Sequence, residues 1–319
     1  MNETASANTT PGTAPVPGPE QKHNTPIHNR NYSQAIKQSP EFMSFQVDFA
    51  VCLKELRGYF HTIIAENFKS PDFLLEKTNS LLRPGQTTID FFDMLHNLRS
   101  VDDSIYVHSL NVALIARMIG KWLKLNAEDL ETLTIAGLLH DIGKSLIPDD
   151  LLNKQGRLTD EEYDLLCQHA KLGYDLLKPL PLDSRIKKSA LMHHERCDGS
   201  GYPEKSTTDD IDDFAHIIAI ADVYDAMTAA RTYRAPLSPF QVIAEFEKDG
   251  LQKYKPKYIL TFLEHIASTY QNNHVLLSDG RAADIVLLNK HHLSKPLVRL
   301  DNGECIDLSR SDLYIHSII

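Results

Sequence analysis

The chain has 319 residues, of which 42% are hydrophobic, and a formal net charge of -10 at pH 7. This length suits one large domain with appendages or two domains, and it allows a substantial buried core. The negative charge argues against broad DNA or RNA binding, which needs basic patches that displace counterions. A small anionic substrate stays compatible, because bound metal ions and a few cations can reverse the potential within one cleft.

The N-terminal stretch MNETASANTTPGTAPVPGPE lacks a basic start followed by an apolar run, so it does not read as a secretory signal. The sequence also lacks a run of about 18 apolar residues, so we expect no membrane span. Its cysteines are widely spaced and form no CxxC pair: Cys52, Cys167, Cys197 and Cys305. This pattern is typical of reduced thiols, and we expect a cytoplasmic protein.

Residues 1–38 are rich in Pro, Thr, Asn and Gly without an apolar period, which predicts a disordered tail. Residues 39–100 are mostly helical. VCLKELRGYFHTII predicts one helix, and FFDMLHNLRS predicts another after the breaker Arg83-Pro84-Gly85. Two roles are open for this N-terminal helical region: an input or dimerisation element, which leaves a homodimer open, and helices that complete the core.

Residues 101–272 are strongly helical. Leu110, Leu114, Met118 and Trp122 recur at four-residue steps and predict an apolar stripe on the first helix. The later helices are indicated by capping residues and apolar periods: Asp129 to His140, a helix opened by the capping-box pair Thr159 and Glu162, Asp183 to about His194, Asp213 through Asp225, and one beginning at Ser238-Pro239.

Residues 273–319 change character. HVLLSDGRAADIVLLNK contains two β-rich runs around Ser-Asp-Gly, and PLVRLDNGECIDLS contains two more around Asp-Asn-Gly, which is a strong hairpin signal. We therefore expect a mainly α fold: a helical bundle with an N-terminal helical region and a small C-terminal antiparallel β subdomain.

Residues of metal-ligand type lie on the predicted helices or at their ends: His108, His140, Asp141, His169, His193, His194 and Asp222. The helical period sets several of them beside apolar residues, so we expect them to point inward. A buried, unpaired carboxylate costs several kcal/mol, and one metal cluster would satisfy all of these groups. Imidazole and carboxylate ligands suit iron, manganese or zinc, an aspartate can bridge two ions, and the lack of cysteine in the set argues against structural zinc.

Five segments surround these residues across residues 102–240: HSLNVALIAR, GLLHDIGKSLIPDDLLNKQGRLTDEE, HAKLGYDLL, HHERCDGSGYP and IAIADVYDAMTAARTYR. They resemble, in the family's order, the successive motifs of the HD-GYP subgroup of the HD phosphohydrolase superfamily. The resemblance implies that residues 101–272 are a helical HD-GYP catalytic domain. It also implies hydrolysis of cyclic di-GMP to linear pGpG, in some members onward to GMP, at a site of two or three ions, usually iron or manganese.

The same resemblance implies how the ligands divide. His108, His140, Asp141 and Asp222 would hold one ion, and His169, His193 and His194 would hold a second, with Asp141 bridging. Two ions about 3.5–4 Å apart can share a hydroxide whose pKa is lowered toward neutrality, and this hydroxide would attack the phosphodiester.

One position departs from the family pattern. Members with three ions carry a glutamate one helical turn before the first histidine, where this sequence has Ser104. The neighbouring Asp102 and Asp103 would lie about 200° and 100° further round a helix. We therefore expect a binuclear site, with the first hydrolytic step as its main reaction.

Four further residues are candidates for substrate contact. Lys144, one turn after His140, could neutralise charge growing on the phosphoryl group and thus join Asp141 as a catalytic residue. Arg231 and Arg234 suit phosphate and guanine recognition through paired hydrogen bonds. Tyr202 lies in a tight Gly201-Tyr202-Pro203 loop, which in the family also contacts partner proteins, including diguanylate cyclase domains.

Two alternatives remain open. A weakly active or inactive member would bind a cyclic dinucleotide or a partner protein and signal without turnover; the intact ligand set argues against it. A different nucleotide, such as a mixed cyclic dinucleotide or a nucleoside phosphate, is the other alternative, because neither the loop nor the arginines choose among bases.

Overall fold

A computed structural model of the chain describes residues 33–83, 85–98, 104–229 and 236–319. Most of the predicted tail, residues 1–32, lies outside this part. Residues 33–37, which the predicted tail included, are helical. Within the described residues, every helix is too short or too polar to cross a membrane.

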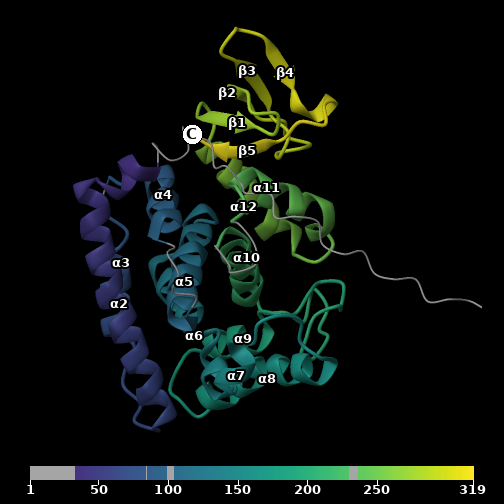
Figure 1. The fold of residues 1–319 in the computed structure, drawn as a ribbon. Coiled ribbons are helices and arrows are strands. Elements are labelled where there is room, and N and C mark those ends of the chain that lie inside the picture. Colours follow the sequence, from purple (N-terminus) through teal and green to yellow (C-terminus); the bar gives the residue numbers. More distant parts are fainter. Residues whose placement is uncertain (1–32, 84, 99–103, 230–235) are drawn as a thin grey trace, which may run out of the picture.

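The described residues of the N-terminal helical region form three helices: α2 (Pro40–Ile64), α3 (Asp72–Ser80) and α4 (Thr88–Leu98). Helix α2 begins earlier than the sequence indicated, because Ser39 caps it by accepting a hydrogen bond from the Phe42 amide. Helix α3 was not predicted, since few of its residues are apolar and the apolar period is short. These helices form one edge of the molecule (Figure 1).

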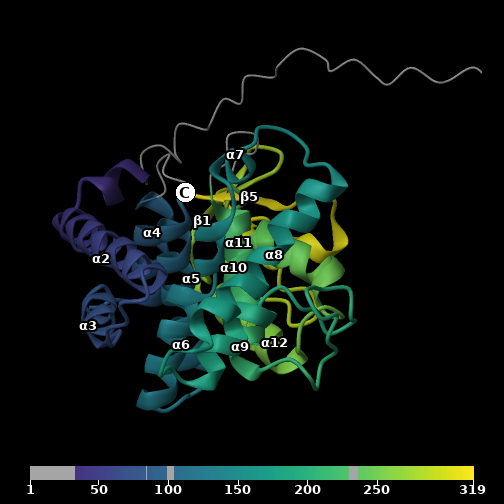
Figure 2. The ribbon, with the colours of Figure 1, turned by 90° about the horizontal axis from the view of Figure 1, so that it is seen from below.

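The central bundle follows the predicted chain order. Its elements are α5 (Ile105–Trp122), α6 (Ala127–Leu139), the short 3-10 helix η1 (Ile142–Leu146), α7 (Asp149–Leu152), α8 (Asp160–Leu177), α9 (Ser184–Met192) and α10 (Asp213–Thr228). Helices α5, α6, α9 and α10 gather at the centre, with α2 and α3 to one side (Figure 2).

The caps of the bundle helices mostly match the predictions. Thr159 and Glu162 form the expected capping box at α8. Helix α10 is capped by Asp212, one residue before the predicted Asp213, because the Asp212 carboxylate accepts from the Phe214 amide. Ser238 caps the next helix as expected, and Gln241 completes a capping box there.

Two helices and a single-turn π-helix separate the bundle from the C-terminal sheet (Figure 1): α11 (Pro239–Glu245), η2 (Phe246–Gly250) and α12 (Pro256–Thr269). The Glu247 carboxylate in η2 holds the loop between residues 287 and 297 of the sheet, because it accepts hydrogen bonds from the Leu293 amide and from the amide and hydroxyl of Ser294.

The C-terminal residues form the predicted antiparallel sheet, with one strand more than expected. Its strands are β1 (His274–Leu277), β2 (Ala282–Leu287), β3 (Leu297–Leu300), β4 (Cys305–Asp307) and β5 (Ile315–Ile318), in the order β4-β3-β2-β1-β5. Strand β5 was missed; it pairs with β1, Val275 facing Ile318. The sheet lies at the end of the molecule away from α7, α8 and α9 (Figure 1).

One hydrophobic core runs through the helices and reaches the sheet. The N-terminal helical region contributes to it directly: the ring centroids of Phe60 and Tyr106 are 5.3 Å apart, and those of Phe92 and Tyr224 are 5.7 Å apart. These contacts favour the interpretation that residues 39–100 complete the core. The mainly α fold with a small β subdomain is confirmed.

Candidate metal centre

Separate elements bring all seven predicted ligands together. They are His108 in the first turn of α5, His140 at the end of α6, Asp141 at the start of η1, His169 in α8, His193 and His194 at the end of α9, and Asp222 in α10. Their ligand atoms form two groups, Asp141 with His169, His193 and His194, and His108 with His140 and Asp222, each within 4.8 Å. The histidines divide as the family resemblance implies, but Asp141 falls only in the group of His169, His193 and His194, whereas the resemblance also counts it with the other group.

The chain changes conformation at the His140-Asp141 pair. Helix α6 ends at His140, and Asp141 takes φ -102° and ψ 10° before the tighter turn of η1. Consecutive residues of a regular helix point about 100° apart. The break lets both side chains reach one place, with Nε2 of His140 3.5 Å from Oδ2 of Asp141.

Gly143 permits a close approach between η1 and α8. A Cβ atom at this position would lie 2.0 Å from the carbonyl oxygen of His169 and 2.5 Å from the amide nitrogen of Gly173. Both are backbone atoms that cannot rotate away, so any larger residue must push the two segments apart. The glycine therefore brings Asp141 within reach of His169.

The two oxygens of Asp141 face different groups. Oδ1 lies 3.3 Å from Nε2 of His169 and 3.5 Å from Nε2 of His193. Oδ2 lies 3.5 Å from Nε2 of His108 and 3.5 Å from Nε2 of His140. The carboxylate thus stands between the groups in the geometry expected of a bridging ligand.

Asp222 also stands between the groups. Its Oδ1 lies 3.0 Å from Nε2 of His108, and its Oδ2 lies 3.8 Å from Nδ1 of His194. Two carboxylates therefore contact histidines of both groups, which increases the negative charge where the imidazoles converge.

Backbone carbonyls fix the orientation of three of the rings. Nδ1 of His140 lies 2.8 Å from the Gly137 oxygen, and Nδ1 of His169 lies 2.7 Å from the Leu166 oxygen. Nδ1 of His193 lies 3.0 Å from the Ser189 oxygen. A carbonyl oxygen only accepts, so each Nδ1 carries the hydrogen, and a neutral ring then presents a lone pair at Nε2.

The protonation states of the buried histidines and of Asp141 favour cation binding. Burial lowers the pKa of His140 to about 3 and that of His169 to about 4, so both rings are neutral at pH 7. Burial alone would raise the pKa of Asp141, but the Lys144 ammonium and the neighbouring histidines bring it well below its usual range. Neutral imidazoles and an ionised aspartate are the forms in which these residues bind metals.

The other half differs in its first histidine. Burial would lower the pKa of His108, but its hydrogen bonds to Asp222 and Asp225 raise it to about 10. The pKa of Asp222 lies well below its usual range, because the His108 hydrogen bond outweighs burial. Here the imidazole and its carboxylates form charged hydrogen bonds.

Buried polar atoms without a hydrogen-bond partner show whether the ligand residues fit divalent cations. Nε2 of His140 and Oδ1 of Asp141 are buried without a hydrogen-bond partner. Nε2 of His169 lies 3.3 Å from Nε2 of His193, beside the Asp141 carboxylate. Buried polar atoms are normally paired, and divalent cations would pair all of these. The residues present therefore fit such ions.

Lys144 lies at the edge of the centre, where its ammonium is 2.5 Å from Oδ2 of Asp141. About a quarter of its side chain is exposed, 24%, whereas that of Asp141 is buried at 1%. The ammonium therefore holds a position between the buried carboxylate and the solvent.

Tyr202 packs on the ligand histidines. Its ring centroid lies 4.6 Å from that of His194 at an interplanar angle of 30°, and 6.2 Å from that of His169. A Cβ atom on Gly201 would lie 2.5 Å from the backbone at His194 and Glu195, so this glycine lets the loop fold onto the histidine pair.

Glu195 anchors the far side of this loop. Its carboxylate is almost fully buried and accepts hydrogen bonds from the amides of Glu204 at 2.7 Å and Ser206 at 3.0 Å. The loop is thus held at both ends of Tyr202, and we did not single out Glu195 from the sequence, where it reads as an ordinary charged residue after the histidine pair.

Some predictions fall outside the described residues: Arg231 and Arg234, and the neighbours Asp102 and Asp103 of the missing glutamate. Ser104 is described, and it caps α5, with its hydroxyl 3.5 Å from the Val107 amide. Helix α5 begins at Ile105, and the expected placement of Asp102 and Asp103 stays a prediction.

Asp225 was missed at the sequence level. It is buried in α10, and its Oδ2 lies 2.8 Å from Nδ1 of His108. Its position three residues after Asp222, on the same face of a helix, was the signal that could have revealed it.

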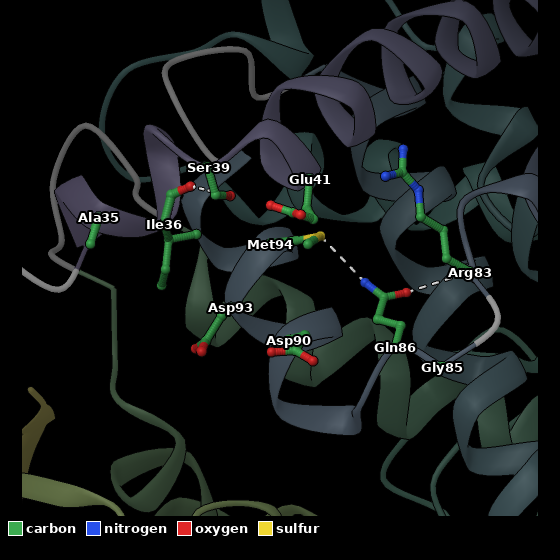
Figure 3. Close-up of a pocket in the computed structure, with 10 residues that line it drawn as sticks. All are labelled: Ala35, Ile36, Ser39, Glu41, Arg83, Gly85, Gln86, Asp90, Asp93 and Met94. Carbon is green, nitrogen blue, oxygen red and sulfur yellow. Dashed lines mark hydrogen bonds between the residues drawn. The ribbon is translucent and has the colours of Figure 1, made fainter.

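A surface cavity of about 610 Å³ lies elsewhere, between the start of α2 and helix α4 (Figure 3). None of the seven ligands lines it. Gln86 bonds to Met94 and to the Arg83 amide, while the Arg83 guanidinium pairs with Asp48 at 3.0 Å. The chemistry of the metal centre is separate from this cavity.

Comparisons with known proteins find similar sequences. A family model described as an HD domain matches residues 82–258, a range that begins before the predicted domain boundary at residue 101. A cyclic di-GMP phosphodiesterase of Pseudomonas aeruginosa is 32% identical over 212 residues, 65% of this chain and 50% of the relative. A 3'3'-cGAMP-specific phosphodiesterase of Vibrio cholerae is 35% identical over 160 residues, 50% of this chain and 31% of the relative. The chain spans half or less of the length of these curated relatives.

A solved structure supports the fold. A Bdellovibrio bacteriovorus HDG"Y"P protein superposes with a TM-score of 0.60 at 16% sequence identity, covering 75% of this chain and 77% of that one. At this identity the likeness bears on the fold alone.

Proposed function

The chain belongs to the HD-domain family, as its motifs predicted, and we propose that it is a metal-dependent phosphodiesterase that hydrolyses cyclic di-GMP to linear pGpG. The observation that carries this proposal is the pair of ligand groups on either side of Asp141, with the lone pairs of neutral imidazoles facing its two oxygens. Relatives whose names state cyclic dinucleotide hydrolysis support the substrate class.

We propose that the centre holds two divalent ions, iron or manganese. His108, His140 and Asp222 would hold one together with Oδ2 of Asp141, and His169, His193 and His194 would hold the other together with Oδ1. Nitrogen and oxygen ligands without cysteine suit both metals. Ser104, which caps α5, supplies no carboxylate for a third.

Bound ions of this kind supply a water of lowered pKa and positive charge for the phosphoryl oxygens. Within the chain, the Lys144 ammonium lies at the solvent edge in contact with Asp141. We propose that Lys144 contacts the reacting phosphate, because a fixed cation stabilises the negative charge that grows on the phosphoryl group during hydrolysis. Tyr202 covers the ligand histidines beside it and would contact the nucleotide with its exposed edge.

The dinucleotide needs contacts beyond the reacting phosphate. We propose that Arg231 and Arg234, which follow α10 in the sequence, bind its second phosphate or its guanines through paired hydrogen bonds. The Gly201-Tyr202-Pro203 loop is our proposed contact for a diguanylate-cyclase-type partner in the cytoplasm, and Glu204 and Lys205 beside it are exposed.

A second candidate substrate is 3'3'-cGAMP. It is favoured by relatives named as specific for this nucleotide, one of them 40% identical over 138 residues. The described site contains metal-ligand and phosphate-binding groups common to both substrates, so the choice of base rests with residues around it.

One experiment tests the function. The protein is loaded anaerobically with Fe²⁺ or Mn²⁺ and incubated with cyclic di-GMP, 3'3'-cGAMP or cyclic di-AMP, and the products are resolved by chromatography. We expect linear pGpG from cyclic di-GMP with the wild type and none with Asp141→Asn. Hydrolysis of 3'3'-cGAMP alone would establish the second candidate. A metal-loaded wild type that cleaves none of them would establish a binding module instead.

A further inference from the structure

The His108 ring is held differently from three other rings of the centre. Backbone carbonyls fix Nδ1 of His140, His169 and His193. Nδ1 of His108 instead meets a side chain, with Oδ2 of Asp225 at 2.8 Å. The orientation of His108 therefore depends on a side chain, which a mutation can remove, whereas a backbone carbonyl stays in every variant.

Asp225 lies where a carboxylate is costly. Only 5% of its side chain is exposed, and 15% of that of His108. An ionised group in such a position costs several kcal/mol unless it is paired and hydrogen-bonded. Helix α10 presents Asp222 and Asp225 three residues apart, so one face of the helix holds both nitrogens of the ring: Asp222 Oδ1 lies 3.0 Å from Nε2.

We propose that Asp225 is a positioning residue that holds His108 with Nε2 toward the centre and strengthens it as a ligand for one of the two ions. This inference rests on the proposed metal centre. A carboxylate that accepts from one ring nitrogen fixes the tautomer and raises the basicity of the other, and loss of such a partner typically lowers metal affinity about 10–100-fold.

The role makes the two halves unequal. The His169 and His193 rings keep their backbone acceptors in any variant of Asp225, so their ion stays bound. Asp225→Ala removes the partner of His108, and we expect one ion to bind about 100-fold more weakly. Asp225→Asn retains an oxygen that accepts from Nδ1 but loses the charge, and we expect a loss of about 10-fold.

The chain offers a matched control. Nδ1 of His274 lies 2.8 Å from Oδ1 of Asp284, a histidine–aspartate hydrogen bond of the same length in the C-terminal sheet. Asp284→Asn removes the charge from this pair away from the metal centre, so it should leave the affinity of both ions unchanged.

Binding of Mn²⁺ to each full-length protein is measured by competition with a chelator, and electron paramagnetic resonance separates isolated from coupled Mn²⁺. We expect the wild type and Asp284→Asn to bind two Mn²⁺ ions with a coupled signal. We expect the Asp225 variants to bind one ion tightly and the second more weakly, so that the coupled signal is replaced by that of an isolated ion. Circular dichroism and the melting temperature of the metal-free proteins report on folding.

The outcomes separate this inference from the function. Two ions of wild-type affinity in both Asp225 variants, or equal weakening of both ions, would overturn the positioning role. A wild type that binds no Mn²⁺ would overturn the metal centre and this inference with it. Selective loss of one ion in a protein that cleaves no dinucleotide would support the inference while the proposed function fails.

Discussion

Nε2 of His169 lies 3.3 Å from Oδ1 of Asp141, and both side chains are 1% exposed. The ring is neutral at pH 7 and donates through Nδ1 to a backbone carbonyl, so its lone pair faces an ionised oxygen. Such a contact is unfavourable without a cation between the atoms. The same conflict at the second oxygen of Asp141, beside His140, is the physical reason to expect two ions.

Loss of one ligand should empty one half of the centre. We predict that His169→Ala binds one ion where the wild type binds two. We predict that Asp141→Asn binds fewer than one, because each oxygen of Asp141 faces histidines of a different group. Metal content after dialysis, measured by mass spectrometry, checks this. His265→Ala, at an exposed position in α12, should retain both ions. Equal metal content in His169→Ala and the wild type would contradict the assignment.

Lys144 should act on turnover more than on metal content. We predict that Lys144→Ala retains both ions and that kcat falls about 10²–10³-fold, the usual effect of removing one charge-stabilising donor. Lys171→Ala, an exposed lysine on α8, is the control and should keep full activity. Steady-state kinetics with parallel metal analysis distinguishes a loss of turnover from a loss of bound metal. Full activity of metal-replete Lys144→Ala would remove this residue from the mechanism.

Gly143 should tolerate no side chain. Gly143→Ala places a Cβ atom 2.0 Å from the His169 carbonyl oxygen, and we predict a loss of at least about 3 kcal/mol in the free energy of unfolding, because overpacking against backbone cannot relax. Gly58→Ala is the matched control in α2, where a Cβ atom meets nothing within 4 Å. It should stabilise the helix by about 0.5–1 kcal/mol. Chemical denaturation measures the free energy of unfolding of both variants. Equal changes in Gly143→Ala and Gly58→Ala would contradict the close approach of η1 and α8.

The metal-free protein should lose stability in mild acid. The pKa values of His140 and His169 are lowered by burial to about 3 and about 4. Between about pH 6.5 and 5 the unfolded chain therefore takes up protons at these rings while the folded chain does not, so the free energy of unfolding falls as the pH falls. We predict a loss of about 2 kcal/mol per histidine at pH 5.

His108 does not oppose this trend. Its pKa is raised to about 10, so its contribution to stability is fully present below pH 6.5 and is lost only as the pH rises toward 10. Urea denaturation of the metal-free protein from pH 6.5 to 5 measures the slope, and His169→Gln should reduce it. A free energy of unfolding that stays constant over this range would contradict the buried, neutral rings.

The helices with strong caps and the hairpins were predictable because their signals are local. Thr159 with Glu162 forms a capping box, and Ser238-Pro239 opens α11. Helix α3 and strand β5 were not predicted, since short segments carry little periodicity and β5 owes its conformation to pairing with β1. Ser104 shows the same limit, because its capping role at the start of α5 was not predicted from the sequence.

The ligand types and their order pointed to the metal centre, but the sequence could not supply its second layer. The roles of Asp225 and Glu195 depend on which atoms lie opposite them in space: Nδ1 of His108, and the amides of Glu204 and Ser206. Gly143 likewise reads as a helix-breaking residue until α8 is seen against it. The spacing of three residues from Asp222 could have marked Asp225, but the contacts of Glu195 and Gly143 leave no fixed spacing in a single sequence.

The most direct test is anomalous diffraction at the manganese edge from crystals of the Mn²⁺-loaded protein. We predict two peaks on either side of Asp141, one within ligand distance of Oδ2, His108, His140 and Asp222, the other within ligand distance of Oδ1, His169, His193 and His194. A single peak, a third peak beside Ser104, or peaks away from Asp141 would contradict a two-ion centre bridged by this carboxylate.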